Sequence, residues 1–237
     1  MNVVLLHALP LDSLMWEPQY EALAGHEVIA PDLYGFGSSM DDWASAVVGL
    51  VEGDFVVVGA SMGGYCALAL TRLAPERVRA LVLAGSRADP DTLERREGRA
   101  KTIQLIRERG AEALWEDMRP KLFPEDADPE VVEAARELAV EQDPDGLIRA
   151  AEAIRDRRDS TDVVEALEVP VLVAVGDRDT FVPVEDAEAL AARARDGRIA
   201  IYRSGHLPSL ERPQEFNGAL EALLDELATT ARDASGV

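Results

Sequence analysis

The sequence is most informative at Phe55-Val56-Val57-Val58-Gly59-Ala60-Ser61-Met62-Gly63-Gly64. The four apolar residues at its start predict a short buried strand, and the apolar run over residues 65–70 predicts a helix soon after it. Between them stands the pattern G-x-S-x-G, in which the serine occupies a sharp turn. Small residues two positions to either side relieve the crowding and leave the hydroxyl exposed. Ser61 is therefore a candidate nucleophile.

The helix after Ser61 begins beside that hydroxyl. Its free N–H groups and its dipole favour a negative charge that develops there during a reaction. The alternative is an ordinary strand-to-helix turn without chemistry, because so short a pattern of common residues also arises by chance. A base and an acid elsewhere in the chain would decide between the two interpretations.

Short apolar runs alternate with helical patterns along most of the chain, which is typical of a parallel sheet covered on both faces. The predicted strands are residues 3–6, 28–30, 55–58, 80–84, 171–175 and 199–202. The predicted helices are residues 16–24, 40–51, 62–73, 184–194 and 213–228. We therefore expect an α/β fold with a mostly parallel six-stranded sheet.

Residues 87–159 interrupt this alternation. They contain no convincing strand, and their amphipathic helical patterns are punctuated by Pro120, Pro124, Pro129 and Pro144. Ligands of open α/β sheets bind outside the carboxyl ends of the strands, so we expect a small helical cap over that edge, inserted after the fourth strand. The alternative is a set of helices that extends the core. The predicted organisation is a core from residues 1–86, a cap from 87–159 and the rest of the core from 160–237.

A serine hydroxyl needs a general base, most often histidine, within hydrogen-bond reach. The three histidines are His7 after the first strand, His26 at the start of the second, and His206 after the last. His26 belongs to the opposite edge of the sheet. His206 follows Gly205 in a loop that suits a base facing Ser61, and it is the predicted base.

The base in turn needs an acid that fixes its tautomer. The loop after the fifth strand offers Asp177 and Asp179. Asp179 is preferred because it lies further from the strand end and can turn inward, whereas Asp177 beside Arg178 is typical of a solvated turn. The chain order is then serine, acid, histidine.

In these features the chain resembles the α/β-hydrolase family over nearly all of its length outside residues 87–159. The matching segments are His7-Ala8-Leu9-Pro10, residues 31–39, Gly59-Ala60-Ser61-Met62-Gly63-Gly64, residues 176–183, and Gly205-His206 followed by Glu211 and Pro213. The family's pattern G-x-x-D-x-x-x-P aligns its aspartate with Asp179. The resemblance implies an α/β-hydrolase fold, here trimmed to six strands because the chain starts at what resembles the family's third strand.

The turn after His7 resembles the family's oxyanion loop. This resemblance implies that the backbone N–H groups of Leu9 and Met62 form the oxyanion hole. The family usually has glycine where this chain has Ala8, and a methyl group there changes how closely the backbone approaches a substrate oxygen. We expect His7 to brace the loop rather than to transfer protons.

The formal net charge of −21 argues against nucleic acid as a partner, because phosphates would be repelled. Basic residues at Arg95, Arg96, Arg99 and Lys101, and again over residues 155–158, are interleaved with acids. We interpret them as solvated helix faces rather than a binding site. The acidic surface weakly favours neutral or cationic substrates.

A single cysteine, Cys66, excludes an intrachain disulfide and a zinc site built on clustered cysteines. No apolar run approaches the roughly 18 residues that cross a bilayer. The chain runs at once into Val3-Val4-Leu5-Leu6, which indicates a first strand rather than a signal peptide. We expect a cytoplasmic protein that does not bind membranes.

Large apolar side chains near the predicted cap and sheet edge are candidates for an acyl or alcohol pocket, with ordinary core packing as the alternative for each. They are Trp16, Tyr34, Phe36, Trp115, Met118 and Phe123.

The predicted function is hydrolysis of small carboxylic esters by Ser61, His206 and Asp179 through an acyl-enzyme, without a metal ion or organic cofactor. The resemblance also leaves open an enol-lactonase or a cofactor-free perhydrolase with the same three residues. A dehalogenase is disfavoured because that branch needs a carboxylate where Ser61 stands. The alternative of another class is a receptor that binds a small ligand without turnover.

Overall fold

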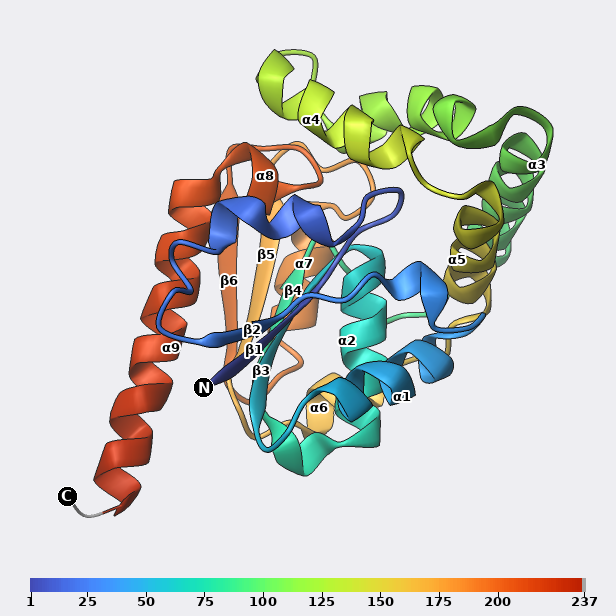
Figure 1. Cartoon of the computed structure of the whole chain (residues 1–237). Coiled ribbons are helices and arrows are strands. Elements are labelled where there is room, and N and C mark those ends of the chain that lie inside the picture. Colours follow the sequence, from blue (N-terminus) through green and yellow to red (C-terminus); the bar gives the residue numbers. More distant parts are fainter. Residues whose placement is uncertain (236–237) are drawn as a thin grey trace.

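Six strands form one sheet at the centre of the molecule (Figure 1). This computed structural model describes residues 1–235, and the side chains of residues 1–230. The strands are β1 (Asn2–Leu6), β2 (Glu27–Ile29), β3 (Phe55–Ala60), β4 (Val78–Ala84), β5 (Val171–Gly176) and β6 (Gly197–Tyr202). They lie in the order β2-β1-β3-β4-β5-β6, and every neighbouring pair is parallel. The predicted six-stranded α/β architecture is confirmed.

The burial of each strand follows its place in the sheet. The inner strands β3 and β5 are buried at every residue, as expected for continuous apolar runs covered on both faces. The outer strand β6 alternates instead, and Ile199 and Ile201 are exposed along it. The core therefore lies on the two faces of β1, β3, β4 and β5.

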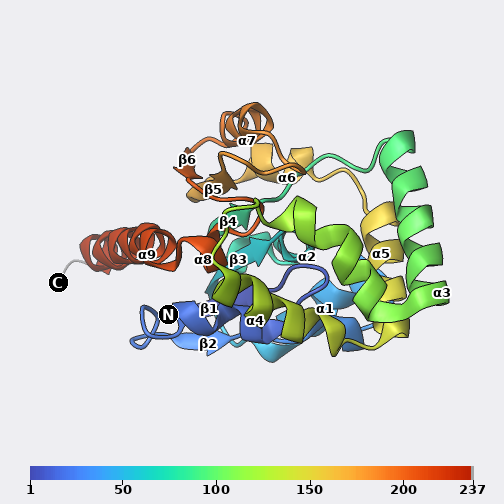
Figure 2. The same cartoon turned by 90° about the horizontal axis from the view of Figure 1, so that it is seen from above.

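Helices cover both faces of this sheet, with α9 on one face and α1 and α2 on the other (Figure 2). The α-helices are α1 (Met40–Leu50), α2 (Met62–Leu73), α3 (Leu93–Leu122), α4 (Pro129–Val140), α5 (Pro144–Asp156), α6 (Thr161–Ala166), α7 (Val184–Ala191), α8 (Pro208–Glu211) and α9 (Pro213–Ser235). Short 3₁₀ helices span Ser13–Gln19, Leu33–Gly35 and Pro75–Arg77.

The helix predicted over residues 16–24 is wrong. The structure has a 3₁₀ helix over Ser13–Gln19, which begins where the Asp12 carboxylate accepts the N–H of Leu14. Pro18 lies inside it and has no N–H to donate, so a regular α-helix through this segment would lose a hydrogen bond.

Between β4 and β5 the chain forms α3, α4, α5 and α6, and the first three of these helices pack together outside the sheet (Figures 1 and 2). The α3 segment is broken at Gly110, whose φ of 74° and ψ of −166° are not helical. At its C-terminal end, the Leu122 carbonyl accepts the N–H of His206, and the Lys121 carbonyl accepts the Thr180 hydroxyl. These helices are thus tied directly to the loops that follow β5 and β6.

Candidate active site

Ser61 occupies a strained turn between β3 and α2. Its φ is 49°, the only positive φ of a residue other than glycine among those that the structure describes. The turn is held from two sides, because the Ser61 N–H donates to the Ala84 carbonyl at 2.7 Å and the Ser86 hydroxyl donates to the Ser61 carbonyl at 2.9 Å. Such strain persists only where the surroundings fix it, and it is common at functional sites.

The glycines around Ser61 are required by close backbone contacts. A Cβ at Gly59 would lie 2.4 Å from the Gly63 carbonyl oxygen, and one at Gly63 would lie 2.0 Å from the carbonyl oxygen of Leu6. No side chain fits at either position, so the pattern G-x-S-x-G lets α2 start tightly against the ends of β1 and β3.

The structure brings His206 and Asp179 to Ser61. His206 Nε2 lies 2.8 Å from Ser61 Oγ, and His206 Nδ1 lies 2.8 Å from Asp179 Oδ2. The side chains of His206 and Asp179 are almost completely buried, which protects their hydrogen bond from water. The three side chains form one continuous line of hydrogen bonds.

The loop after β5 explains why Asp179, and not Asp177, points inward. The second carboxylate oxygen of Asp179 accepts the backbone N–H groups of Phe181 at 2.8 Å and Val182 at 3.1 Å. The carboxylate is thereby fixed in the turn with its other oxygen toward His206. Asp177 is exposed and lies 3.7 Å from Arg178 Nε.

The loop that carries His206 is braced on two sides. Glu211 Oε1 accepts the Gly205 N–H at 2.8 Å, and the Leu122 carbonyl accepts the His206 N–H at 2.9 Å. Burial raises the pKa of the Glu211 carboxyl above its ordinary value. The Phe181 ring lies 4.7 Å from the imidazole, centroid to centroid, and limits its rotation.

Leu9 and Met62 supply free backbone donors near Ser61. Met62 is the first residue of α2, so its N–H has no partner within the helix. Within residues 1–235, neither this N–H nor that of Leu9 donates to another backbone group, and Leu9 lines the cavity at Ser61. The N–H of Ala8, the residue before Leu9, donates to Met15 Sδ at 3.2 Å and is therefore not available to a substrate.

His7 is placed as a brace, as the sequence predicts. Its Nε2 accepts the Leu33 N–H at 2.9 Å, and its Nδ1 lies 3.3 Å from the Ala8 carbonyl oxygen. An acceptor at Nε2 requires the neutral imidazole with its proton on Nδ1. Burial lowers the pKa of His7, which keeps the ring neutral.

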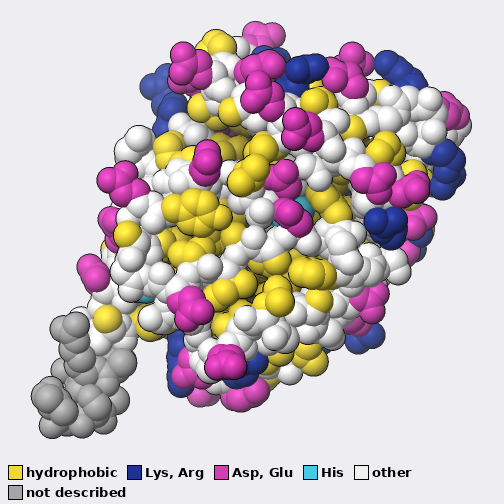
Figure 3. All heavy atoms as spheres, in the orientation of Figure 1, with side chains coloured by type: hydrophobic (Ala, Val, Ile, Leu, Met, Phe, Trp, Pro, Cys, Tyr) yellow, Lys and Arg dark blue, Asp and Glu magenta, His cyan; other side chains and the backbone are white. Residues whose placement is uncertain are grey.

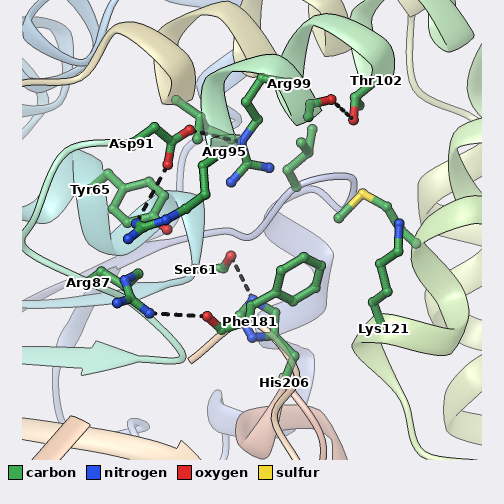
Figure 4. Close-up of a pocket in the computed structure, with 14 residues that line it drawn as sticks. Ser61, Tyr65, Arg87, Asp91, Arg95, Arg99, Thr102, Lys121, Phe181 and His206 are labelled. Atoms are coloured by element: carbon green, nitrogen blue, oxygen red, sulfur yellow. Dashed lines mark hydrogen bonds and ion pairs between the residues drawn. The ribbon is translucent and has the colours of Figure 1, made fainter. Parts of the chain in front are cut away.

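A cavity of about 250 Å³ opens at Ser61 (Figure 4). Its walls near the serine are Leu9, Tyr65, Met118, Phe181 and His206. Met118 is the only one of the six predicted pocket residues that lines this cavity.

The other five predicted pocket residues lie elsewhere. Trp115 is buried with its ring centroid 6.2 Å from that of Phe123, and Trp16 packs in the same way near Phe216 at 6.3 Å. The Tyr34 hydroxyl donates to the Leu11 carbonyl at 2.7 Å. Phe36 is half-buried against the core. Large apolar side chains here fill the core because that removes the most area from water.

The interpretation of the basic residues as solvated helix faces is wrong for three of them. Arg95 and Arg99 line the cavity, and Arg157 is buried with Nη1 2.7 Å from Asp91 Oδ1. The spacing of Arg95 and Arg99, four residues apart on one helix face, is the signal that could have indicated a shared surface. Arg96, between them, points away to Asp156.

Two further observations concern residues 1–235. No helix in this range is both long and apolar enough to span a membrane. Among the side chains that the structure describes, those of residues 1–230, no group of three or more His, Cys, Asp and Glu is arranged to hold a metal ion.

Comparisons with known proteins agree with this architecture. The model of the alpha/beta hydrolase family matches residues 3–219. A solved structure of a thermophilic esterase from Thermogutta terrifontis, with malate bound, is 35% identical with a TM-score of 0.89, covering 96% of this chain and 90% of that one.

Curated relatives extend over similar lengths. The 3-oxoadipate enol-lactonase 2 of Acinetobacter baylyi is 25% identical, covering 94% of this chain and 88% of its own length. The pimeloyl-[acyl-carrier protein] methyl ester esterase of Nitrosomonas europaea is 26% identical, and the match covers 94% of this chain and 95% of that protein. Since the family model spans nearly the whole sheet and the segment between β4 and β5, this chain belongs to the alpha/beta hydrolase family.

Proposed function

We propose that this protein hydrolyses carboxylic esters of small molecules, with Ser61 as nucleophile, His206 as general base and Asp179 as the acid that orients the base. One observation carries the proposal. The hydrogen-bonded line from Asp179 through His206 ends at a serine hydroxyl that opens on a cavity. Esterases and an enol-lactonase among the relatives support the same reaction class.

In the first half-reaction, Ser61 Oγ attacks the ester carbonyl carbon while His206 Nε2 takes the hydroxyl proton. The carbonyl oxygen becomes an oxyanion that accepts hydrogen bonds from the N–H groups of Leu9 and Met62. The imidazolium then gives its proton to the leaving alcohol, and the acyl group stays on Ser61. The Asp179 carboxylate stabilises the imidazolium and keeps the Nδ1 proton in place.

In the second half-reaction, water enters the position that the alcohol has left. His206 removes a proton from it, hydroxide attacks the acyl carbon, and the proton returns to Ser61 Oγ as the carboxylic acid leaves. We propose that α3, α4 and α5 act as the cap over this cavity, because the end of α3 bonds directly to the loops of Asp179 and His206.

The experiment is hydrolysis of p-nitrophenyl acetate by the parent protein and by Ser61→Ala. We expect kcat/KM to fall by at least about three orders of magnitude, since the nucleophile is lost. Ser38→Ala is the matched control, because Ser38 is exposed and away from the cavity. Equal activity of the Ser61→Ala protein and the parent would refute the proposal, and a parent that hydrolyses none of the esters and lactones tested would favour a receptor.

The second candidate is an enol-lactonase, which would use the same three residues. Relatives of that description at 25% and 26% identity support it. A panel of esters and lactones with graded chain lengths separates the esterase from the lactonase. A lactonase would hydrolyse a lactone and would not hydrolyse the acyclic esters. Inclusion of hydrogen peroxide in the panel tests the perhydrolase alternative through the peracid that would form.

A further inference from the structure

The cavity above Ser61 is cationic, although the chain as a whole carries a net charge of −21. Its walls include four basic side chains, Arg87, Arg95, Arg99 and Lys121, and a single acidic one, Asp91. The outer surface differs, since acidic side chains are scattered over the face seen in Figure 3. Basic side chains gathered beside Ser61 on an otherwise acidic protein favour an anionic ligand at this site.

Two of the four cations are already paired. Arg87 donates to Asp89 at 2.9 Å and to Asp186 at 2.8 Å, with a further bond to the Phe181 carbonyl. Lys121 Nζ lies 2.7 Å from Asp117 and is about half exposed. Their charge is therefore largely balanced by neighbouring carboxylates.

Arg95 and Arg99 are balanced less completely. Arg95 shares Asp89 with Arg87, through Nη2 at 2.8 Å, and among the described side chains Arg99 pairs with Asp91 alone. Asp91 is their shared carboxylate, and its strongest contact is with a third guanidinium, since Arg157 Nη1 lies 2.7 Å away. Arg99 reaches Asp91 only through Nε at 3.2 Å, and Arg95 Nη1 lies 3.9 Å from it. Four guanidinium groups, of Arg87, Arg95, Arg99 and Arg157, thus share three carboxylates, Asp89, Asp91 and Asp186, which leaves one positive charge without a partner in this cluster.

Donors on both arginines remain free. Arg95 Nη1 is buried and has no hydrogen-bond partner among the described side chains and backbone, while its Nη2 bonds to Asp89. Arg99 makes its one hydrogen bond through Nε, which leaves both of its Nη atoms without an acceptor in the described chain. In Figure 4 the Arg99 guanidinium extends from α3 into the space above Ser61.

The Arg99 side chain is 20% exposed and lines the cavity, so a carboxylate that enters can accept charge-assisted hydrogen bonds from its free Nη donors. An uncharged group of the same shape would leave the charge unbalanced, so a site of this kind rejects it. We infer that the substrate carries a carboxylate, bound by Arg99 beside the positive charge of Arg95, in addition to the ester or lactone bond that Ser61 attacks. This inference rests on the proposed function and reverses the weak preference for neutral or cationic substrates indicated by the acidic composition.

The size of the cavity limits the substrate further. A volume of about 250 Å³ suits a small molecule, so the carboxylate stands only a few bonds from the scissile carbonyl. Monoesters of short dicarboxylic acids and lactones with a carboxylate side group have this form.

The test compares the rates of hydrolysis of paired esters that differ only in a free carboxylate or a carboxamide at the far end. Monomethyl succinate, glutarate and adipate are each measured against the ester in which the free carboxylate is a carboxamide, with acid release followed by titration. We expect kcat/KM to favour the best carboxylate ester at least about tenfold over its amide. Arg99→Gln should reduce the ratio of kcat/KM for the carboxylate ester to that for the amide toward one. Arg99→Lys keeps the positive charge but lacks the two parallel N–H donors of the guanidinium group, so it should give an intermediate ratio.

Arg107→Gln is the control, because Arg107 is exposed on the same helix, outside the cavity, and the substitution changes net charge equally. It should leave the ratio as in the parent. Circular dichroism and labelling of Ser61 by a fluorophosphonate identify any Arg99 variant that has lost its fold. If the Arg99 variants do not fold, the inhibition of ester hydrolysis by glutarate is compared with the inhibition by glutaramide, both measured on the parent protein.

The outcomes separate this inference from the proposed function. If the parent hydrolyses p-nitrophenyl acetate but shows no preference for carboxylate over carboxamide, the inference is overturned and the hydrolase proposal stands. An equal preference in the parent and in a folded Arg99→Gln protein overturns the assignment to Arg99. If the parent hydrolyses none of the esters, both fail together.

Discussion

His206 Nε2 lies 2.8 Å from Ser61 Oγ, although 145 residues separate the two in the chain. Ser61 follows β3 and His206 follows β6, with β4 and β5 between these strands. All six strands run the same way, so the segments after their ends meet at one edge of the sheet. The parallel topology is what allows so distant a pair to meet.

Asp179→Asn should lower kcat for ester hydrolysis by about four orders of magnitude, with little change in stability. An amide can still accept the N–H groups of Phe181 and Val182, but its NH₂ group facing His206 favours the wrong imidazole tautomer. Steady-state kinetics together with thermal unfolding check this. Asp177→Asn is the matched control and should retain parent activity, and equal losses in the two variants would contradict the role given to Asp179.

Gly63→Ala should destabilise the fold by more than about 2 kcal/mol, because the new Cβ would lie 2.0 Å from the Leu6 carbonyl oxygen. Denaturant unfolding measures the loss. At Gly218, exposed in α9, a Cβ meets nothing within 4 Å. Gly218→Ala should therefore keep or raise stability, by up to about 1 kcal/mol. Similar stabilities of the two variants would disprove the close approach at Gly63.

His7 should make the free energy of unfolding pH-dependent in mildly acidic solution. In the unfolded chain the imidazole takes up a proton as pH falls through about 6.5, whereas burial lowers the pKa of His7 in the folded protein and keeps it neutral there. The unfolded state then binds more protons, so stability falls as pH falls below about 6.5.

His7→Gln removes this titration, whatever its effect on stability at neutral pH. Denaturant unfolding at pH 7.5, 6.5 and 5.5 should give a shallower decline for the variant than for the parent. Parallel declines would show that His7 has the same pKa in both states.

The sequence predicts most of what depends on local pattern. The alternation of apolar runs and helical stretches predicts all six strands to within a few residues. The glycines around Ser61 predict the turn, because the close contact of Gly59 with Gly63 lies within five residues. The Leu6 carbonyl that excludes a side chain at Gly63 comes instead from a distant strand. Asp179 could be chosen over Asp177 because the turn that buries it is also local.

What depends on tertiary packing could not be predicted in the same way. Trp115 and Phe123 are apolar enough for a pocket, and only the packing of α3 shows that they contact each other instead. Arg95 and Arg99 stand among acids in the sequence, but Asp91 is shared with Arg157 from α5's end, 66 residues away. Charge balance in the cavity is therefore a property of the folded chain.

Covalent labelling by a fluorophosphonate, with the modified residue located by mass spectrometry of the intact protein and its peptides, identifies the nucleophile. We expect one adduct, on Ser61, formed faster in the parent than in Asp179→Asn and absent from Ser61→Ala. An unlabelled but folded parent, or an adduct on another residue that persists in Ser61→Ala, would contradict this expectation.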